Sequence, residues 1–258
     1  MVELVFLCGV KLYHLSKIKV GAVSYLNTKP LLYGVKRSGL MDKIELIEAY
    51  PAKIAQMLLD DEIDVGLVPV AIMPKLKEAY IVTDFCIGAE TAVASVCLFS
   101  EVPIEQIETV ILDYQSRTSV NLAKVLLKEY WQKNVVFKEA TDNFRDEISG
   151  TTAAVVIGDR AFEQRFISKY SYDLATAWIA HTSLPFVFAA WIANKSLHQD
   201  FIEAFSMANA YGIKHIDEVI AENNYDKYDL KKYYTENISY QLTESKRKGL
   251  ALFLEKLR

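Results

Sequence analysis

Residues 18–49 read IKVGAVSYLNTKPLLYGVKRSGLMDKIELIEA, which we interpret as a strand, a turn, a helix and a second strand. The first six residues are mostly apolar and include Ile and two Val, as is typical of a strand covered on both faces. Residues 28–38 carry apolar side chains at helical spacing, and 44–49 have a strand pattern again. A strand, a helix and a strand in succession form the basic unit of α/β proteins, so we expect an α/β fold.

The same alternation continues along the chain in a second round. We expect further helices at 51–59, 119–131 and 160–167, and further strands at 64–68, 93–99, 109–112, 153–157 and 184–192. The pattern after residue 192 is helical, which predicts a helical C-terminal tail. Two such blocks, joined by strands that cross between them, predict two lobes. We expect an N-terminal extension at 1–16, a discontinuous first lobe at 17–93 and 190–258, and a second lobe at 94–189.

Composition and charge exclude several classes of protein. The 258 residues are 52% hydrophobic with 10 Gly and 6 Pro, which indicates neither a disordered nor a collagen-like chain. With 29 Lys and Arg against 33 Asp and Glu, the net charge of −4 argues against a nucleic-acid partner. No stretch reaches the roughly 18 consecutive apolar residues of a membrane span, so we expect no membrane insertion.

The first sixteen residues contain an apolar run without the preceding Lys or Arg that a secretory signal requires. We therefore expect a poorly packed extension and a cytoplasmic protein. Cys8, Cys86 and Cys97 are odd in number and lie in apolar runs, which predicts buried thiols rather than a disulfide.

The segment 113–119, DYQSRTS, is the strongest candidate for a ligand site. It follows an expected strand and opens an expected helix, where free backbone N–H groups attract anions. The hydroxyls of Ser116, Thr118 and Ser119 and the guanidinium of Arg117 would add donors for a carboxylate or a phosphate. The alternative is that Thr118 or Ser119 only caps the helix and that Arg117 is solvated. Four residues suited to anions, all in one turn, favour a ligand site.

Two other turns also follow strands directly. Ligands of such folds bind at the carboxyl ends of the strands, which makes Tyr25, Asn27, Thr28 and Asp159 candidates. The alternative is helix capping, which the residues alone favour at 24–28 and which is at least as good an interpretation of Asp159.

The sequence lacks the signatures of common catalytic sites. The four histidines are scattered and form no H-x-x-x-H pattern, so we expect no metal site. There is no C-x-x-C, G-x-S-x-G or G-x-G-x-x-G motif, so we expect no cofactor and no thiol, serine or hydride chemistry. Tyr233, Tyr234 and Tyr240 in the tail are interpreted as packing aromatics.

The motifs at these turns resemble those of a known family. VGAVSYLNTKPL at 20–31 and SRTS at 116–119 are similar to segments of the chorismate dehydratases, menaquinone-biosynthesis enzymes of the futalosine pathway. Further similarity is found at 63–69, 95–100, 158–161, 184–189 and 235–240. The resemblance extends over essentially 18–257.

This resemblance implies a type II periplasmic-binding-protein-like fold with a ligand cleft between two lobes. It implies a cofactor-independent hydro-lyase whose small-molecule substrate is chorismate and whose product is 3-[(1-carboxyvinyl)oxy]benzoate. Asn27 and Ser95 would then be catalytic residues. The substrate would be bound by Tyr25, Thr28, Ser116, Arg117, Thr118, Ser119 and Asp159.

A protein of another class could use the same residues. A solute-binding protein for a small carboxylate would need the same fold, cleft and anion site, since a fold does not determine function. Such a receptor is exported, and residues 1–16 do not have the pattern of an export signal. We therefore expect the enzyme rather than the receptor.

Overall fold

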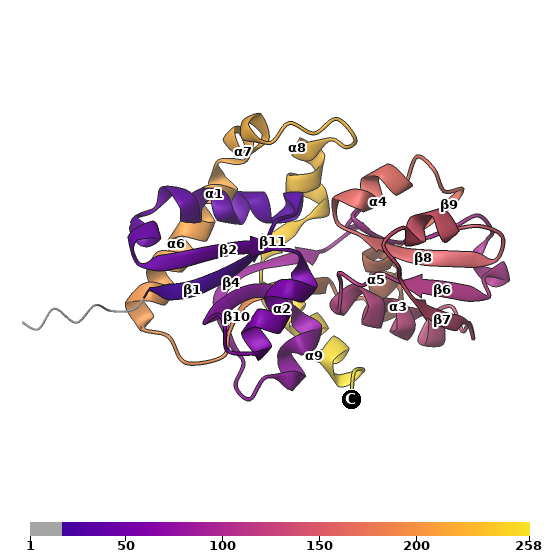
Figure 1. The fold of residues 1–258 in the computed structure, drawn as a ribbon, viewed down its shortest axis with the longest axis horizontal. Helices are drawn as coiled ribbons and strands as arrows, with labels where there is room; N and C mark the ends of the chain where they lie inside the picture. The colour runs from indigo at the N-terminus through magenta and orange to yellow at the C-terminus, as the bar shows by residue number, and fades with distance from the viewer. Residues whose placement is uncertain (1–16) are drawn as a thin grey trace, which may run out of the picture.

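The computed structural model describes residues 17–258, so the predicted N-terminal extension and Cys8 lie outside the described residues. Two sheets, each with its own helices, lie side by side and form two lobes (Figure 1). The chain crosses from the first lobe to the second and returns to the first for its C-terminal part. The expected α/β class is confirmed.

The first lobe contains a six-stranded sheet that combines early and late parts of the chain. In spatial order its strands are β11 (Ser239–Gln241), β4 (Tyr80–Ala89), β10 (Phe186–Ala193), β3 (Val65–Pro69), β1 (Ile18–Val23) and β2 (Ile44–Ala49). β1 is parallel to β2 and β3, whereas β10, which returns from the other lobe, is antiparallel to both of its neighbours. The helices of this lobe are α1 (Lys29–Arg37), α2 (Pro51–Leu59), α6 (Gln199–Lys214), α7 (Ile216–Glu222), α8 (Leu230–Lys232) and α9 (Glu244–Glu255).

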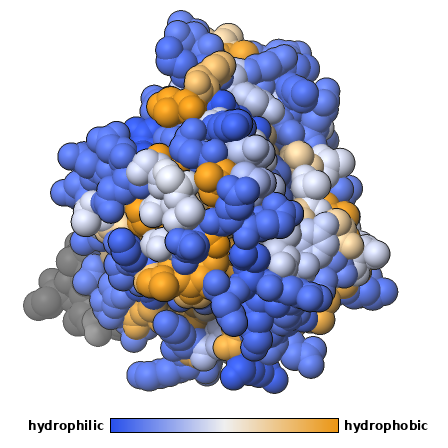
Figure 2. All heavy atoms as spheres, turned by 90° about the vertical axis from the view of Figure 1, so that its right-hand side faces the viewer, coloured by the Kyte–Doolittle hydropathy of each residue, from blue (hydrophilic) through white to orange (hydrophobic). Residues whose placement is uncertain are grey.

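The second lobe contains a five-stranded sheet. In spatial order its strands are β7 (Val136–Glu139), β6 (Thr109–Leu112), β8 (Thr152–Ile157), β5 (Val96–Ser100) and β9 (Tyr170–Asp173). β6 is parallel to β7 and β8, and β5 is antiparallel to β8 and β9. Its helices are α3 (Thr118–Glu129), α4 (Asp159–Gln164) and α5 (Leu174–Thr182). Figure 2 shows the outer side of this lobe, which is mostly hydrophilic with small hydrophobic areas.

Several strands differ from the sequence-based expectation. The pattern does not predict β4, because the polar pair Thr83 and Asp84 interrupts its apolar residues. The strand expected at 93–99 begins only at Val96, since Ala94 has a φ of 64°, which a strand does not accommodate. β7 and β9 lack an apolar run, because Lys138 and Glu139 end the one and Ser171 and Asp173 interrupt the other, and α5 was not expected either.

The sequence predicts a helical C-terminal tail, but the tail in the structure is not entirely helical. β11 joins the edge of the first sheet, and residues 230–237 of the tail are divided between α8 and a π-helical turn at Tyr233–Asn237. β10 begins at Phe186, which places residues 186–189 in the first sheet. The lobe boundaries stay predictions.

The cysteines of the described part agree with the sequence. Cys86 and Cys97 are buried free thiols, as predicted. Within residues 17–258, we find no helix that is both long enough and apolar enough to span a bilayer.

Helix α1 begins directly after the turn at 24–28 and is held in place by α6. The two backbones touch at a pair of glycines. A Cβ atom at Gly34 would lie 1.8 Å from the carbonyl oxygen of Ala208, and one at Gly212 would lie 1.8 Å from that of Pro30. Only glycine permits this approach, so the contact fixes where α1 and the preceding turn lie.

We expect Gly212→Ala to lower the free energy of unfolding by about 1–3 kcal/mol, because the added methyl group forces α1 and α6 apart. Gly39→Ala is the matched control, since a Cβ atom there meets nothing within 4 Å. Urea denaturation of both variants measures the effect. Equal stabilities for the two would contradict a tight contact between these helices.

Candidate active site

A pocket lies between the two lobes, at the ends of strands from both sheets. Val23, Pro69 and Ile157, the last residues of β1, β3 and β8, all contribute to its wall. The cavity is narrow, at about 50 Å³. This is the position at which folds of this class bind ligands. The other lining residues are Tyr25, Asn27, Thr28, Pro51, Leu67, Ile87, Val93, Val96, Ser116, Thr118, Ser119, Gly158, Phe188 and Ala189.

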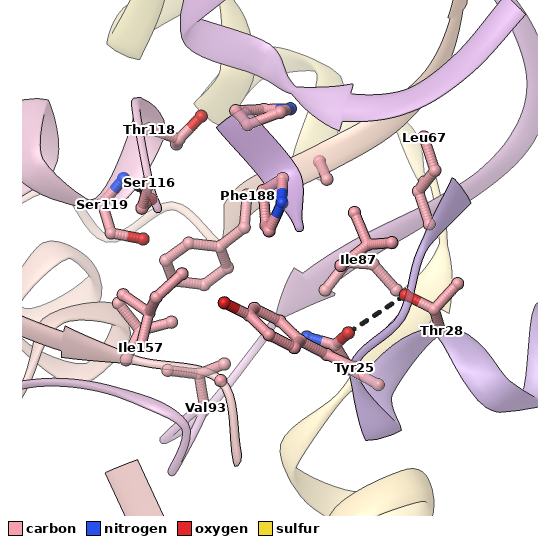
Figure 3. Close-up of a pocket in the computed structure, with 17 residues that line it drawn as sticks. Tyr25, Thr28, Leu67, Ile87, Val93, Ser116, Thr118, Ser119, Ile157 and Phe188 are labelled. Atoms are coloured by element: carbon pink, nitrogen blue, oxygen red, sulfur yellow. Dashed lines mark hydrogen bonds between the residues drawn. The ribbon is translucent and has the colours of Figure 1, made fainter. Parts of the chain in front are cut away.

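The first turn of α3 forms the polar wall on the side of the second lobe. The hydroxyl oxygen of Ser116 accepts a hydrogen bond from the Ser119 backbone N–H at 3.0 Å, so Ser116 caps the helix. The alternative in which Thr118 or Ser119 is the cap is therefore wrong, and both face the pocket instead (Figure 3). Their hydroxyls and the N-terminal end of a twelve-residue helix are suited to a carboxylate.

The Asp113 carboxylate holds this wall in shape. It is 1% exposed and accepts hydrogen bonds from the backbone N–H groups of Gln115 at 3.0 Å and Ile157 at 3.2 Å. It also forms an ion pair with Arg160 at 2.6 Å. Because Gln115 lies in the turn after β6 and Ile157 ends β8, Asp113 ties together the two turns that face the first lobe.

On the side of the first lobe, Asn27 and Thr28 lie at the start of α1. The Asn27 Oδ1 atom accepts a hydrogen bond from the Thr28 hydroxyl at 3.2 Å, drawn in Figure 3. The Asn27 backbone carbonyl accepts one from the Tyr240 hydroxyl at 3.0 Å. The tail therefore fixes the Asn27 backbone, and Asn27 lines the same pocket as the first turn of α3.

Tyr25 extends from the first lobe across the pocket (Figure 3). Its hydroxyl donates a hydrogen bond to Gln115 of the second lobe. The ring lies against Gly158, where a Cβ atom would be 2.7 Å from Tyr25 Cε2 and where φ is 65°. Both the close approach and the left-handed backbone require glycine at this position. Burial raises the pKa of Tyr25, so its hydroxyl stays protonated.

Ser95 does not line the pocket, contrary to the expectation that it would. Its side chain is fully buried, and its Oγ atom accepts a hydrogen bond of 2.7 Å from the Tyr233 hydroxyl. Tyr233 is fully buried as well, which raises its pKa well above the ordinary value and keeps it a donor. Ser95 thus lies behind the pocket wall formed by its neighbours Val93 and Val96.

Asp159 is also outside the pocket lining, although its neighbour Gly158 belongs to it. Its carboxylate accepts the backbone N–H of Leu26, at 3.2 Å and 3.4 Å to the two oxygens, and so links the lobes. Burial raises the pKa of this carboxyl to about 6. The side chain is therefore a cross-lobe link in this arrangement, and substrate contact by Asp159 stays a prediction.

Arg117 points away from the pocket. Its guanidinium donates a hydrogen bond of 2.9 Å to the side-chain carbonyl of Gln56 on α2, across the gap between the lobes. Among residues 17–258, no charged side chain lines the pocket itself. The sequence identified the turn that carries Arg117 but not the direction of its side chain.

Sequence reasoning missed the role of the tail. The sequence predicts packing aromatics at Tyr233 and Tyr240, yet their hydroxyls donate hydrogen bonds to Ser95 and to the backbone carbonyl of Asn27. Phe188, which lies between the two polar walls in Figure 3, was not singled out. The sequence signals that could have indicated these residues were the family-like segments at 184–189 and 235–240.

In the described part of the chain, no group of three or more His, Cys, Asp or Glu could hold a metal ion.

Comparison with known proteins places this pocket in context. A family model described as menaquinone biosynthesis matches residues 18–258. A chorismate dehydratase of Thermus thermophilus is 28% identical over 262 residues, covering 92% of this chain and 94% of the relative.

Solved structures show the same fold. A crystal structure of a protein from Archaeoglobus fulgidus has a TM-score of 0.76 at 16% identity and covers 95% of this chain and 97% of that one. A Candida albicans protein, described as exhibiting the generic periplasmic binding protein structural fold, has a TM-score of 0.59 at 15% identity, with coverage of 94% and 89%. The expected two-lobed, periplasmic-binding-protein-like fold is confirmed.

We expect Asp113→Asn to lower the free energy of unfolding by about 3–5 kcal/mol, because it leaves the largely buried Arg160 without its counter-ion. Asp84→Asn is the control, since Asp84 lies equally close to Arg247, at 2.6 Å, but in an exposed pair. Asp84→Asn should lower the free energy of unfolding by less than about 1 kcal/mol. Urea denaturation measures the free energy of unfolding of both variants. Equal losses would mean that Asp113 does not stabilise the pocket wall formed by the first turn of α3.

The raised pKa of Asp159 predicts a pH-dependent stability. An acid with a higher pKa in the folded than in the unfolded protein stabilises the fold at pH below both values, and this contribution is lost as the pH rises through the folded value. Between about pH 5 and about pH 8, Asp159→Asn should therefore gain stability relative to the parent, by on the order of 1–3 kcal/mol. Asp142→Asn, which removes an exposed carboxylate, is the control. If the free energies of unfolding of Asp159→Asn and of the parent change with pH in parallel, the pKa of Asp159 is not raised in the folded protein.

Proposed function

Because this chain belongs to the menaquinone biosynthesis family, we propose that it removes water from chorismate and forms 3-[(1-carboxyvinyl)oxy]benzoate. The observation that supports this most directly is the pocket, whose lining brings Asn27 of the first lobe together with the hydroxyls at the N-terminal end of α3 in the second. Nearly the whole chain aligns with a protein named as a chorismate dehydratase, which supports the same activity.

The chemistry matches a largely apolar pocket whose polar groups are neutral. Chorismate carries two carboxylates, and the first turn of α3 offers hydroxyls and a positive helix end to one of them. The reaction breaks the C3–H and C4–O bonds, and the ring becomes aromatic as hydroxide and proton leave as water. A carbanion at C3 is stabilised by conjugation with the ring carboxylate. Such a step needs orientation and charge stabilisation rather than a nucleophile.

We assign the proton transfer to the substrate itself. An amide is far too weak a base to remove a proton from carbon, so Asn27 does not act as the base. The enolpyruvyl carboxylate of chorismate takes the C3 proton, and Asn27 orients the reacting groups. Ser95 acts through its bond to Tyr233, which fixes the crossing segment behind the pocket, rather than by touching the substrate.

The remaining features of the proposal follow from this activity. The enzyme is a hydro-lyase that uses no metal and no organic cofactor, and its partner is the small molecule chorismate. The cytoplasmic location expected from the sequence stays a prediction.

Incubation of the purified protein with chorismate tests the proposal. We expect a product lighter by one water, identified by mass spectrometry and by its aromatic proton resonances, in the presence of EDTA as well. Chorismate without protein gives the background. A solute-binding protein would bind chorismate and leave it unchanged. This result would contradict the proposed enzyme and favour a solute-binding protein.

Variants of Asn27 test its orienting role. Asn27→Asp should lose most activity, because a carboxylate repels the dianionic substrate and cannot supply the amide N–H. Asn27→Ala should be slow but should still bind chorismate through α3. Single-turnover rates between about pH 5 and about pH 9 compare them, with the exposed Asn134→Asp as control. An Asn27→Asp variant as active as the parent would overturn both the orienting role and the substrate as base.

A further inference from the structure

A second cavity, of about 360 Å³, adjoins the pocket and shares Ser116 with it. We name it the cationic vestibule after three of its lining residues, Lys75, Arg117 and Lys124. We propose that the cationic vestibule is an anion-binding entry site, which captures the dicarboxylate substrate before it reaches the pocket. The identity of that substrate rests on the proposed function.

The need for such a site follows from the pocket. Its lining within residues 17–258 contains no Lys or Arg, so no full positive charge faces a ligand there. The end of a helix carries only about half a charge, and its attraction fades within the first turn. A dianion in solution is therefore attracted mainly by charges outside the pocket.

The cationic vestibule supplies those charges. Within the described part of the chain, none of its three cations forms an ion pair. The acidic groups that line the same cavity are Asp113 and Glu139. The charge of Asp113 is balanced by Arg160, so the lining carries three positive charges against the one negative charge of exposed Glu139. Asp60 lies outside the lining and accepts a hydrogen bond from the Gln56 amide at 2.9 Å.

Two hydrogen bonds across the lobes separate the cationic vestibule from the pocket. The Thr118 hydroxyl oxygen, on the pocket side, accepts the backbone N–H of Ala71, on the vestibule side, at 3.2 Å. Arg117 donates to Gln56 at 2.9 Å beside it. Both bonds break when the lobes part, which joins the two spaces.

Arg117 is suited to respond to an anion. Its partner Gln56 is neutral, and a guanidinium bonds more strongly to a carboxylate than to an amide. An arriving carboxylate can therefore replace Gln56 and release one of the two bonds that lie between the cationic vestibule and the pocket. Lys75 and Lys124, one from each lobe, would hold the anion at the entrance meanwhile.

The test compares two double variants with the same change in net charge. Lys75→Gln/Lys124→Gln removes two vestibule cations, and Lys169→Gln/Lys248→Gln removes two exposed cations outside both cavities. For each, kcat and kcat/KM for chorismate are measured at about 20 mM and about 300 mM NaCl, since steering by charge is screened by salt. Binding of benzene-1,3-dicarboxylate, an unreactive dianion, is measured by calorimetry under the same conditions.

We expect the vestibule variant to lose about tenfold in kcat/KM and in affinity for the dianion at low salt, with kcat within about twofold of the parent. The loss should shrink at high salt, and the control variant should resemble the parent. Equal behaviour of the two variants would overturn the entry site. If the parent protein does not consume chorismate, the proposed function is wrong. The calorimetric affinities of the variants for benzene-1,3-dicarboxylate would then test the cationic vestibule without the activity measurement.

Discussion

The carboxylate of Asp113 is the group on which the second lobe's half of the pocket depends. Its oxygens accept backbone N–H groups from the turn after β6 and from the end of β8, and they also bind Arg160. A buried carboxylate that loses any of these partners pays a desolvation cost that the remaining ones do not offset. The first turn of α3 and the backbone at Gly158 are therefore fixed relative to each other, and this half of the pocket moves as one body.

The contact between the lobes is of a different kind. No sheet runs through both lobes in the described part of the chain. The lobes are linked by single hydrogen bonds, as at Leu26 with Asp159 and at Ala71 with Thr118, and by apolar packing, as of Trp178 against Phe186. Each bond of this type contributes roughly 0.5–1.5 kcal/mol net, because water replaces the partner when the bond opens. Opening the hydrogen bonds beside the pocket is thus inexpensive compared with deformation of either lobe. This combination suits a pocket as narrow as this one, which a ligand can enter only when the lobes part.

The sequence predicted the fold class and the turns of the site for a common reason. Periodicity is a local property, so the alternation of strands and helices and the turns that follow strands are visible in it. The direction of Arg117 is not visible, because it depends on what the facing lobe offers. The bond between Tyr233 and Ser95 joins residues 138 positions apart, and nothing near either residue indicates the other. A family-like motif at 95–100 contains Ser95, whereas the one at 235–240 begins after Tyr233, and only the three-dimensional structure shows that Ser95 lies behind the pocket wall.

The discontinuity of the first lobe has a consequence for the growing chain on the ribosome. The second sheet uses only residues 96–173, so all of its strands exist long before synthesis ends. The first sheet is incomplete until β10, inside the sheet, and β11, at its edge, have been synthesised. Until then β3 and β4 have unpaired edges. The contacts that fix Asn27 and Ser95 come from Tyr240 and Tyr233, among the last residues to be made. A nascent chain therefore contains all strands of the second sheet well before it contains a complete pocket, and the contacts that fix Asn27 and Ser95 form only with the final segment.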